Sequence, residues 1–396
     1  MAVWPLPRIT FRGLSSLDEP RPVALLTTSA AWSALHSILT LPVVIQAEPP
    51  RSDRDLIEYL AAHLPSHVEA VYAVGDGAAV EAAKIVAAHN AKPLVIVPSA
   101  LDGVAPFLPT ARVDTEAEGQ KRIEQIETGP AAEVVVDWEV IEAAPPARRA
   151  AGIVEVLSAA SALLDWRHSA KQGQNPPAER FTPWAASVAT DLARQAIKSA
   201  AALGEGQPEA LQTLLDLLLL LVQLGNQLGH RRLHQGSEHF LADILAVKSD
   251  PSLTPAERLG PSLLFAYAVH GQNLTPLRDA LQAAQIPLNR VRTTDFGLSL
   301  DNLKRHLDRF EFPYSVLNDL DPDSMEVIGA LHASGLAVRA ETWREPMVPS
   351  RSSVPAAEAP HDDKRLHVLS PSEPAVAEAD QATRPAEDAA DAAAIE

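Results

Sequence analysis

The chain has 396 residues, enough for two hydrophobic cores, since single cores stop growing well below this length. Its net charge of -18 at pH 7 would repel nucleic-acid phosphates and anionic lipid headgroups, so both are poor candidate partners. The absence of cysteine excludes disulfides and thiolate metal ligands, which leaves His, Asp and Glu for any metal chemistry. We therefore expect a soluble cytoplasmic protein.

Residues 1–145 alternate short apolar runs with helical patterns. Continuous apolar strands separated by helices are typical of a parallel sheet that is covered on both faces. The expected strands are Val23 to Thr28, Pro42 to Ala47, Ala70 to Gly75, Pro93 to Pro98 and Ala132 to Asp137. This part is therefore predicted to be a doubly wound α/β domain.

Residues 146–340 consist of long amphipathic segments without comparable strand runs, which predicts an all-α domain and a site between the two domains. The expected helices are Arg148 to Ser169, Ala185 to Leu203, Pro208 to Leu228 and His239 to Val247. The longest apolar run, Leu214 to Val222, is about half the roughly 20 residues that a membrane span needs, so we expect a core helix and no span. Residues 345–396 contain no aromatic residue and are predicted to form a disordered acidic tail.

A turn with two glycines follows the third expected strand. Gly75, Asp76 and Gly77 lead directly into the helical run AAVEAAKIVAAH. Glycines at such a turn let backbone amides approach a pyrophosphate, and the helix N-terminus adds positive potential. A purely structural turn uses the same glycines, so the pattern alone leaves both interpretations open.

The turn, together with Glu81 and Lys84, lies at the spacing of the GGGxxxDxxK motif of the iron-containing alcohol dehydrogenase, glycerol dehydrogenase and 3-dehydroquinate synthase superfamily. The chain resembles the glycerol-1-phosphate dehydrogenase branch of it. This resemblance implies that NAD or NADP binds to a set of six residues. They are Gly75, Asp76, Gly77, Ala78, Ala79 and Ser99. Asp76 replaces the middle glycine, and its carboxylate would repel the pyrophosphate unless it turns away. We therefore predict weak binding, which Asp76→Gly would tighten at least about tenfold.

The segment Val97 to Pro106 resembles the VPTxxSxDGxAS segment of glycerol-1-phosphate dehydrogenases. The resemblance implies that Asp102 is the carboxylate that contacts the substrate. The loop is about two residues shorter than in the family, and Pro106 replaces the final serine. A simple Asp-Gly turn is the alternative interpretation.

Three further segments resemble those that carry the family's metal ligands. In the helix that ends in ALLDWR, Glu155 stands where the family has an Asp ligand, and glutamate oxygen is a competent zinc ligand. Gln235 to Asp243 resembles S-G-S-E-H-x-x-S-H, and the segment around His270 resembles H-G-E/K-x-V. The resemblance thus implies a divalent metal, most simply zinc, held by Glu155, His239 and His270. An exposed helix glutamate and structural histidines are the alternatives.

The implied fold is dehydroquinate synthase-like, and the implied reaction is hydride transfer between NAD(P) and a small polyol or polyol phosphate, such as dihydroxyacetone phosphate. The metal would polarise the carbonyl, with Asp102 and Glu155 as catalytic residues. Asp243 replaces a histidine that contacts the substrate, and its charge would repel a phosphorylated one. A 3-dehydroquinate synthase-like lyase and a catalytically degenerate, non-enzymatic homologue are the alternatives. A homo-oligomer is compatible with all three.

Overall fold

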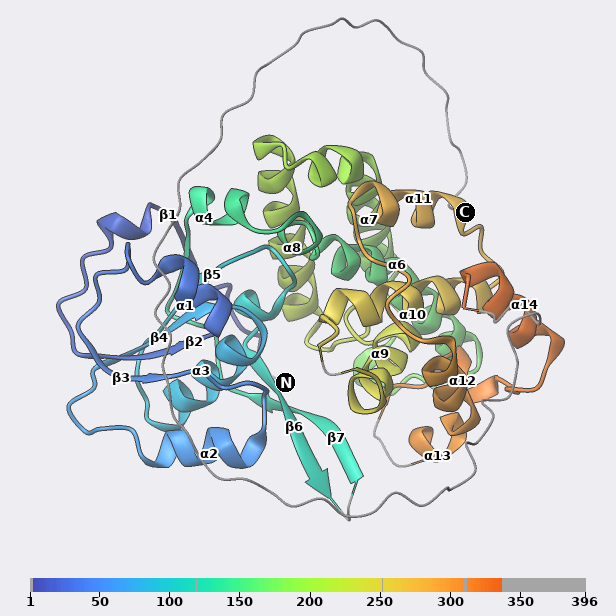
Figure 1. Cartoon of the computed structure of the whole chain (residues 1–396). Helices are drawn as coiled ribbons and strands as arrows, with labels where there is room; N and C mark the ends of the chain where they lie inside the picture. The colour runs from blue at the N-terminus through green and yellow to red at the C-terminus, as the bar shows by residue number, and fades with distance from the viewer. Residues whose placement is uncertain (1–2, 118–119, 251, 309–311, 337–396) are drawn as a thin grey trace, which may run out of the picture. The chain divides into compact units, whose positions relative to one another are not determined.

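Six parallel strands form the main sheet, in the order β1-β8-β5-β4-β2-β3 (Figure 1). The computed structural model describes residues 3–117, 120–250, 252–308 and 312–336, so the predicted tail lies outside the described residues. The strands are β1 (Arg8–Phe11), β2 (Val23–Thr27), β3 (Val43–Ala47), β4 (Ala70–Gly75), β5 (Leu94–Pro98) and β8 (Glu133–Val136). All five predicted strands are confirmed, whereas β1, a four-residue edge strand, was missed.

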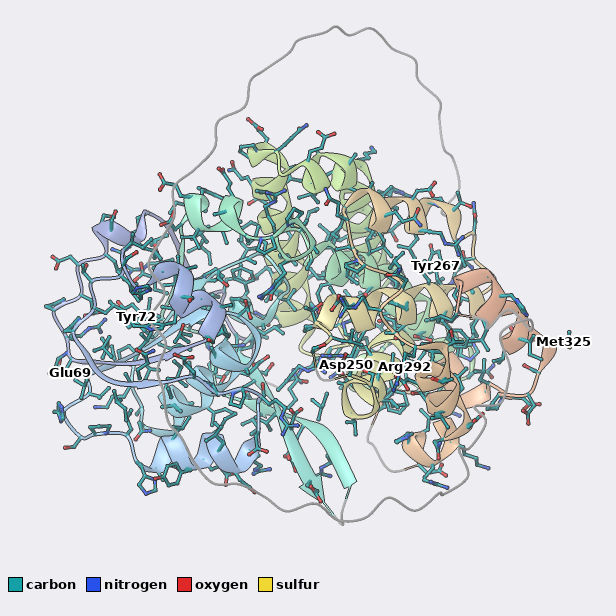
Figure 2. All side chains as sticks on the ribbon, in the orientation of Figure 1. Glu69, Tyr72, Asp250, Tyr267, Arg292 and Met325 are labelled. Atoms are coloured by element: carbon teal, nitrogen blue, oxygen red, sulfur yellow. The ribbon has the colours of Figure 1, made fainter. Side chains whose placement is uncertain are left out.

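Alternating side chains of the sheet enter two different cores. On β4, Val71 and Ala73 join the large core that continues into the helical part, while Tyr72 and Val74 face the opposite core. The helices of this part are α1 (Ser29–Leu35), α2 (Arg54–Ala62), α3 (Gly77–His89) and α4 (Trp138–Ala143). Figure 2 labels Tyr72 within the sheet and Tyr267 within the helical part. Burial on both faces explains why these strands are continuous apolar runs.

The chain changes direction across the sheet between β2 and β4. It runs from β2 outward to the edge strand β3, and then returns to the other side of β2 to form β4, β5 and β8 in turn. In an open parallel sheet, ligands bind outside the carboxyl ends of the strands at this kind of switch point. Gly75 ends β4 there, and Thr28, the N-cap of α1, directly follows β2.

An antiparallel hairpin, β6 (Thr110–Ala117) and β7 (Gln120–Glu127), was not predicted. Its sequence, TARVDTEA followed by QKRIEQIE, is too polar to form the apolar runs that indicated the other strands. Gln235, which lies in the later, helical part of the chain, donates a hydrogen bond to Gln125 of β7 across 3.1 Å. The hairpin therefore supplies contacts between the two parts of the chain.

Helices make up the rest of the described chain, and the four predicted segments are confirmed as α6 to α9. The helices are α5 (Pro146–Arg149), α6 (Ile153–Lys171), α7 (Pro183–Glu205), α8 (Pro208–Leu228), α9 (Ser237–Lys248), α10 (Pro255–Val269), α11 (Thr275–Ala283), α12 (Thr293–Asp301), α13 (Leu303–Leu307) and α14 (Met325–Ser334). Short 3-10 helices are η1 (Leu14–Ser16), η2 (Ala105–Phe107), η3 (Pro177–Glu179) and η4 (Val316–Asp319). The predicted fold class is thus confirmed. A domain boundary near residue 145 stays a prediction, because one hydrophobic core includes residues from both sides of that position.

Helix α8 is the only helix in the described part of the chain that is long and apolar enough to cross a membrane. Its Leu214, Leu218 and Leu221 are completely buried, and the helix packs against α6 and α7. The core helix of a soluble protein can be equally long and apolar, so these packing contacts account for the apolar character of α8.

The packing of α7 against α11 requires a glycine. A side-chain carbon at Gly204 would lie 1.9 Å from the carbonyl oxygen of Ala283, which is backbone and cannot rotate away. We predict that Gly204→Ala lowers the free energy of unfolding by at least about 2 kcal/mol in urea titrations. Gly329→Ala in α14 is the control, because nothing lies within 4 Å of the added carbon. It should be neutral or stabilising by up to about 1 kcal/mol. Equal effects would contradict this packing.

Candidate active site

The glycine turn after β4 leaves backbone open to a ligand. Gly75 has a φ of +130°, and a side-chain carbon there would lie 3.1 Å from Oγ1 of Thr28. Gly77 begins α3 with a φ of +44°, is exposed, and has nothing within 4 Å of its missing side chain. Ala78 is half-buried and Ala79 is fully buried against the sheet. The turn therefore fits a pyrophosphate: it is narrow at Gly75 and open at the N-terminus of α3.

The side chain of Asp76 is held by two partners. Its Oδ2 accepts a hydrogen bond from Oγ of Ser99 across 3.0 Å, and it forms an ion pair with Arg148. The same nitrogen of Arg148, Nη2, lies 3.2 Å from Oδ2 of Asp102. The glycine turn, the predicted substrate loop and α5 therefore meet at the guanidinium group of Arg148. The sequence contained no signal for Arg148, which lies outside every motif.

The two carboxylates that share Arg148 influence each other. Burial, and then the charge of Asp76, raises the pKa of Asp102 to about 7, although Arg148 opposes this shift. A single cation thus does not fully compensate both acids. Asp102 should therefore change its protonation state close to neutral pH.

The Asp102 loop lies against the first turn of α6. The amide of Gly152 donates to the carbonyl of Leu101 across 2.8 Å, and a side-chain carbon at Gly152 would lie 2.7 Å from that oxygen. A side-chain carbon at Gly103 would lie 3.8 Å from Cγ of Glu155. The predicted substrate loop therefore borders the predicted metal ligand Glu155.

Glu155 and His239 are brought together. Nε2 of His239 lies 3.0 Å from Oε2 of Glu155, and Nδ1 lies 2.9 Å from Oε1 of Glu238, a fully buried carboxylate. Burial alone lowers the pKa of His239, but Glu155 and Glu238 together raise it to about 10. The pair is thus an imidazolium between two carboxylates. Nearby, burial lowers the pKa of His234 to about 4, so this ring is neutral beside it.

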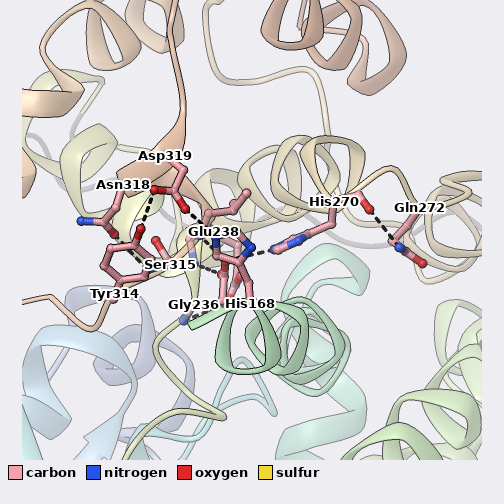
Figure 3. A network of polar contacts seen from close by, with 12 residues as sticks. His168, Gly236, Glu238, His270, Gln272, Tyr314, Ser315, Asn318 and Asp319 are labelled. Carbon is pink, nitrogen blue, oxygen red and sulfur yellow. Dashed lines mark hydrogen bonds and ion pairs between the residues drawn. The ribbon is translucent and has the colours of Figure 1, made fainter. Parts of the chain in front are cut away.

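His270 has a different partner. Its Nε2 lies 3.0 Å from Oδ1 of Asp165, whose carboxylate also accepts from the amides of Ser237 at 2.6 Å and Val316 at 3.0 Å. Figure 3 shows His270 in a polar network on the helical side with His168 and its neighbours. His270 therefore contacts a different carboxylate from His239.

Glu155 and His239 are chemically suitable metal ligands, but two side chains are fewer than a metal site needs. Two ligands of a tetrahedral zinc lie roughly 3.3 Å apart, and the 3.0 Å between His239 and Glu155 is close to this value. However, within the described ranges no group of three or more His, Asp or Glu side chains is placed to hold a metal ion. The three-residue metal site stays a prediction.

Asp243 is neutralised by a residue of the hairpin. It lies on α9 one helical turn after His239, and it forms an ion pair with Arg112 of β6, which raises the pKa of Arg112. Arg112 is also close enough to Glu155 for their charges to interact. The repulsion that we expected between Asp243 and a phosphorylated substrate is therefore balanced by a cation. Sequence reasoning missed Arg112 because it missed the hairpin.

Comparisons with known proteins support the resemblance. The iron-containing alcohol dehydrogenase family matches residues 27–145, from the end of β2 to just beyond α4. The glycerol-1-phosphate dehydrogenase (NAD(P)+) of Pyrococcus horikoshii is 26% identical over 231 residues, which are 58% of this chain and 62% of that protein. The protein of the same name from Methanothrix thermoacetophila is 25% identical over 268 residues, 66% and 72% of the two chains. The chain thus spans less than two thirds of the first of these relatives.

A solved structure agrees at the level of the fold. A probable glycerol dehydrogenase from Sinorhizobium meliloti has a TM-score of 0.59 and 19% identity, covering 85% of this chain and 98% of that one. The predicted resemblance to the iron-containing alcohol dehydrogenase superfamily is confirmed by these matches. So is the predicted fold, an α/β part followed by a helical part.

The raised pKa of Asp102 predicts a pH-dependent stability. The folded protein keeps the Asp102 proton up to about pH 7, whereas the unfolded chain loses it near its usual value of 3.8. This contribution is fully present below pH 3.8 and is lost as the pH rises through 7. Between pH 5 and 8, wild type should lose about 1 to 3 kcal/mol relative to Asp102→Asn in urea titrations. Parallel pH profiles for the two proteins would contradict the shift.

Proposed function

We propose that the chain is an NAD(P)-dependent oxidoreductase that reduces the carbonyl of a small polyol-like ketone. One observation carries the proposal: the open turn at Gly77 is linked through Asp76 and Arg148 to the Asp102 loop, and this loop borders Glu155. A cofactor site and a set of acid-base side chains are thus adjacent. The named activity of the P. horikoshii relative supports NAD(P) as the cofactor class.

The cofactor would bind along the turn from Gly75 to Ala79. Its pyrophosphate would face the N-terminus of α3, where the exposed Gly77 admits close approach of the backbone. Ser99, whose amide donates to the carbonyl of Gly75 across 3.2 Å, fixes the neighbouring strand end. Bound in this way, the cofactor would supply the hydride.

Reduction adds that hydride to the carbonyl carbon and one proton to the carbonyl oxygen, which gives a secondary alcohol. Asp102 would orient the substrate by accepting a hydrogen bond from a hydroxyl beside the carbonyl. Without a metal ion, the Nε2–H of His239, which lies 3.0 Å from Oε2 of Glu155, would be the proton donor. Glu155 would stabilise the protonated ring until transfer. If Glu155 and His239 hold a metal ion, that ion would polarise the carbonyl instead.

The paired charges of Asp243 and Arg112 favour a small polar substrate. Their ion pair is part-exposed, with 34% and 38% of the two side chains accessible, so hydroxyl groups can reach both partners. A phosphate could be accepted by Arg112 through charge-assisted hydrogen bonds. Dihydroxyacetone phosphate and dihydroxyacetone are therefore the substrates to compare first.

One observation favours the non-enzymatic alternative. Asp76, Asp102, Asp243 and His270 are all engaged in internal ion pairs or hydrogen bonds, so a ligand must compete with these contacts. A scaffold protein that kept the fold would show the same pairing. Binding and turnover measurements separate the two functions.

We predict that the purified protein oxidises NADH or NADPH when dihydroxyacetone phosphate or dihydroxyacetone is added, as followed by nicotinamide absorbance. Gly77→Val should weaken cofactor binding at least about tenfold, because a β-branched residue is strained at this φ and fills the open turn. Gly173→Val is the control: it has a φ of +67° and open space, but lies after α6. If wild type binds neither NADH nor NADPH and reduces neither substrate with either cofactor, the non-enzymatic alternative holds.

The metal prediction has its own test. If Glu155 and His239 hold a divalent ion, elemental analysis should find zinc or another such metal in wild type, and less of it in Glu155→Gln and His239→Ala. Asp319→Asn, on the exposed side of the His168 contact, removes a carboxylate elsewhere and should leave the metal content unchanged. Wild type that takes up no added zinc would show that this prediction is wrong.

A further inference from the structure

Arg148 lies where it can influence the binding of an anion at the glycine turn after β4. It forms an ion pair with Asp76, the residue between the two glycines, and its side chain is 31% exposed. Both of its carboxylate contacts use Nη2. Within the part of the chain that the structure describes, Nε and Nη1 of Arg148 make no hydrogen bond. A partly exposed guanidinium with unused donors therefore lies beside the N-terminus of α3.

The direction of the Asp76 side chain also affects how strongly an anion can bind at this turn. Its carboxylate accepts from Oγ of Ser99 and does not cap α3, so it points towards the end of β5. An unpaired carboxylate at this turn would repel a pyrophosphate, whereas the Asp76–Arg148 pair has no net charge as long as Asp102, which shares Arg148, is protonated. Arginine is suited to this task, because its fork of donors binds a carboxylate and a phosphate oxygen at once.

We propose that Arg148 is a cofactor-binding residue that replaces the lost middle glycine in function: it cancels the charge of Asp76 and donates Nε and Nη1 to the pyrophosphate. The inference rests on the proposed NAD(P) dependence of the chain. It changes the expectation for Asp76→Gly, since Asp76 should now oppose binding only when Arg148 is absent. The effects of the two residues on affinity are therefore coupled.

A double-mutant cycle measured by NADH fluorescence titration tests this coupling. Arg148→Met should weaken NADH binding at least about tenfold, because the donors are lost and Asp76 is left unpaired. Asp76→Gly should change affinity by less than about threefold in wild type, but should tighten binding at least about fivefold in the Arg148→Met protein. Arg148→Lys, which keeps the charge without the fork, should fall between wild type and Arg148→Met.

Two controls make the result specific. Arg149→Met removes the same charge from the adjacent residue of α5, whose contacts are the carbonyls of Glu142 and Gly204, and should change affinity less than about twofold. ADP-ribose carries the pyrophosphate without the nicotinamide and should show the same coupling as NADH. If Arg148→Met does not fold, as judged by circular dichroism, Arg148→Gln, which stays polar but loses the charge, replaces it in the cycle, with Asp76→Asn as the second substitution.

The outcomes separate this inference from the proposed function. Equal effects of Asp76→Gly in both backgrounds, or unchanged binding by Arg148→Met, overturn the role of Arg148 while NAD(P) dependence stands. Wild type that binds neither NADH, NADPH nor ADP-ribose overturns both. Coupling for NADH without coupling for ADP-ribose would also overturn the inference, because it would place Arg148 away from the pyrophosphate.

Discussion

The backbone contact between Leu101 and Gly152 sets the geometry on which the candidate site depends. A hydrogen bond of 2.8 Å joins them, and there is no room for a side chain at Gly152. The loop after β5 is thereby pressed against the first turn of α6. Asp102 and Glu155, one from each part of the chain, consequently border the same space. Any residue other than glycine at position 152 would push these two carboxylates apart.

Charge compensation is the second organising constraint. Buried or half-buried acids are costly unless a cation or several donors accompany them. Asp76 and Asp243 replace a glycine and a histidine of the motifs that the chain resembles, and each is paired with an arginine from a distant segment. Each of these acids thus has a cation beside it, which reduces the uncompensated charge at the site. Such charge compensation agrees with a ligand-binding site and also with a non-enzymatic scaffold protein that kept only the fold.

The histidines illustrate how carboxylates decide which side chains meet. His239 is fixed between Glu238 and Glu155 by a contact on each ring nitrogen. His270 is turned to Asp165, which two backbone amides also hold in place. The two rings therefore contact different carboxylates, although both lie in segments that resemble metal-binding motifs. A buried carboxylate with three donors is a stable anchor, and releasing His270 would leave it short of one partner.

The sequence by itself determined five of the six strands of the main sheet, the long helices and the position of the glycine turn, because hydrophobic periodicity and backbone flexibility are local properties. It also indicated Glu155 and His239, which lie 3.0 Å apart, and Asp102, whose loop borders Glu155. The sequence did not predict the hairpin of β6 and β7, because its polar strands lack hydrophobic periodicity. Only the tertiary structure decided that Arg148 meets Asp76 and that Arg112 meets Asp243, because these pairs are separated by 72 and 131 residues. Contacts at such distances follow from how sheet and helices pack, which no local pattern encodes.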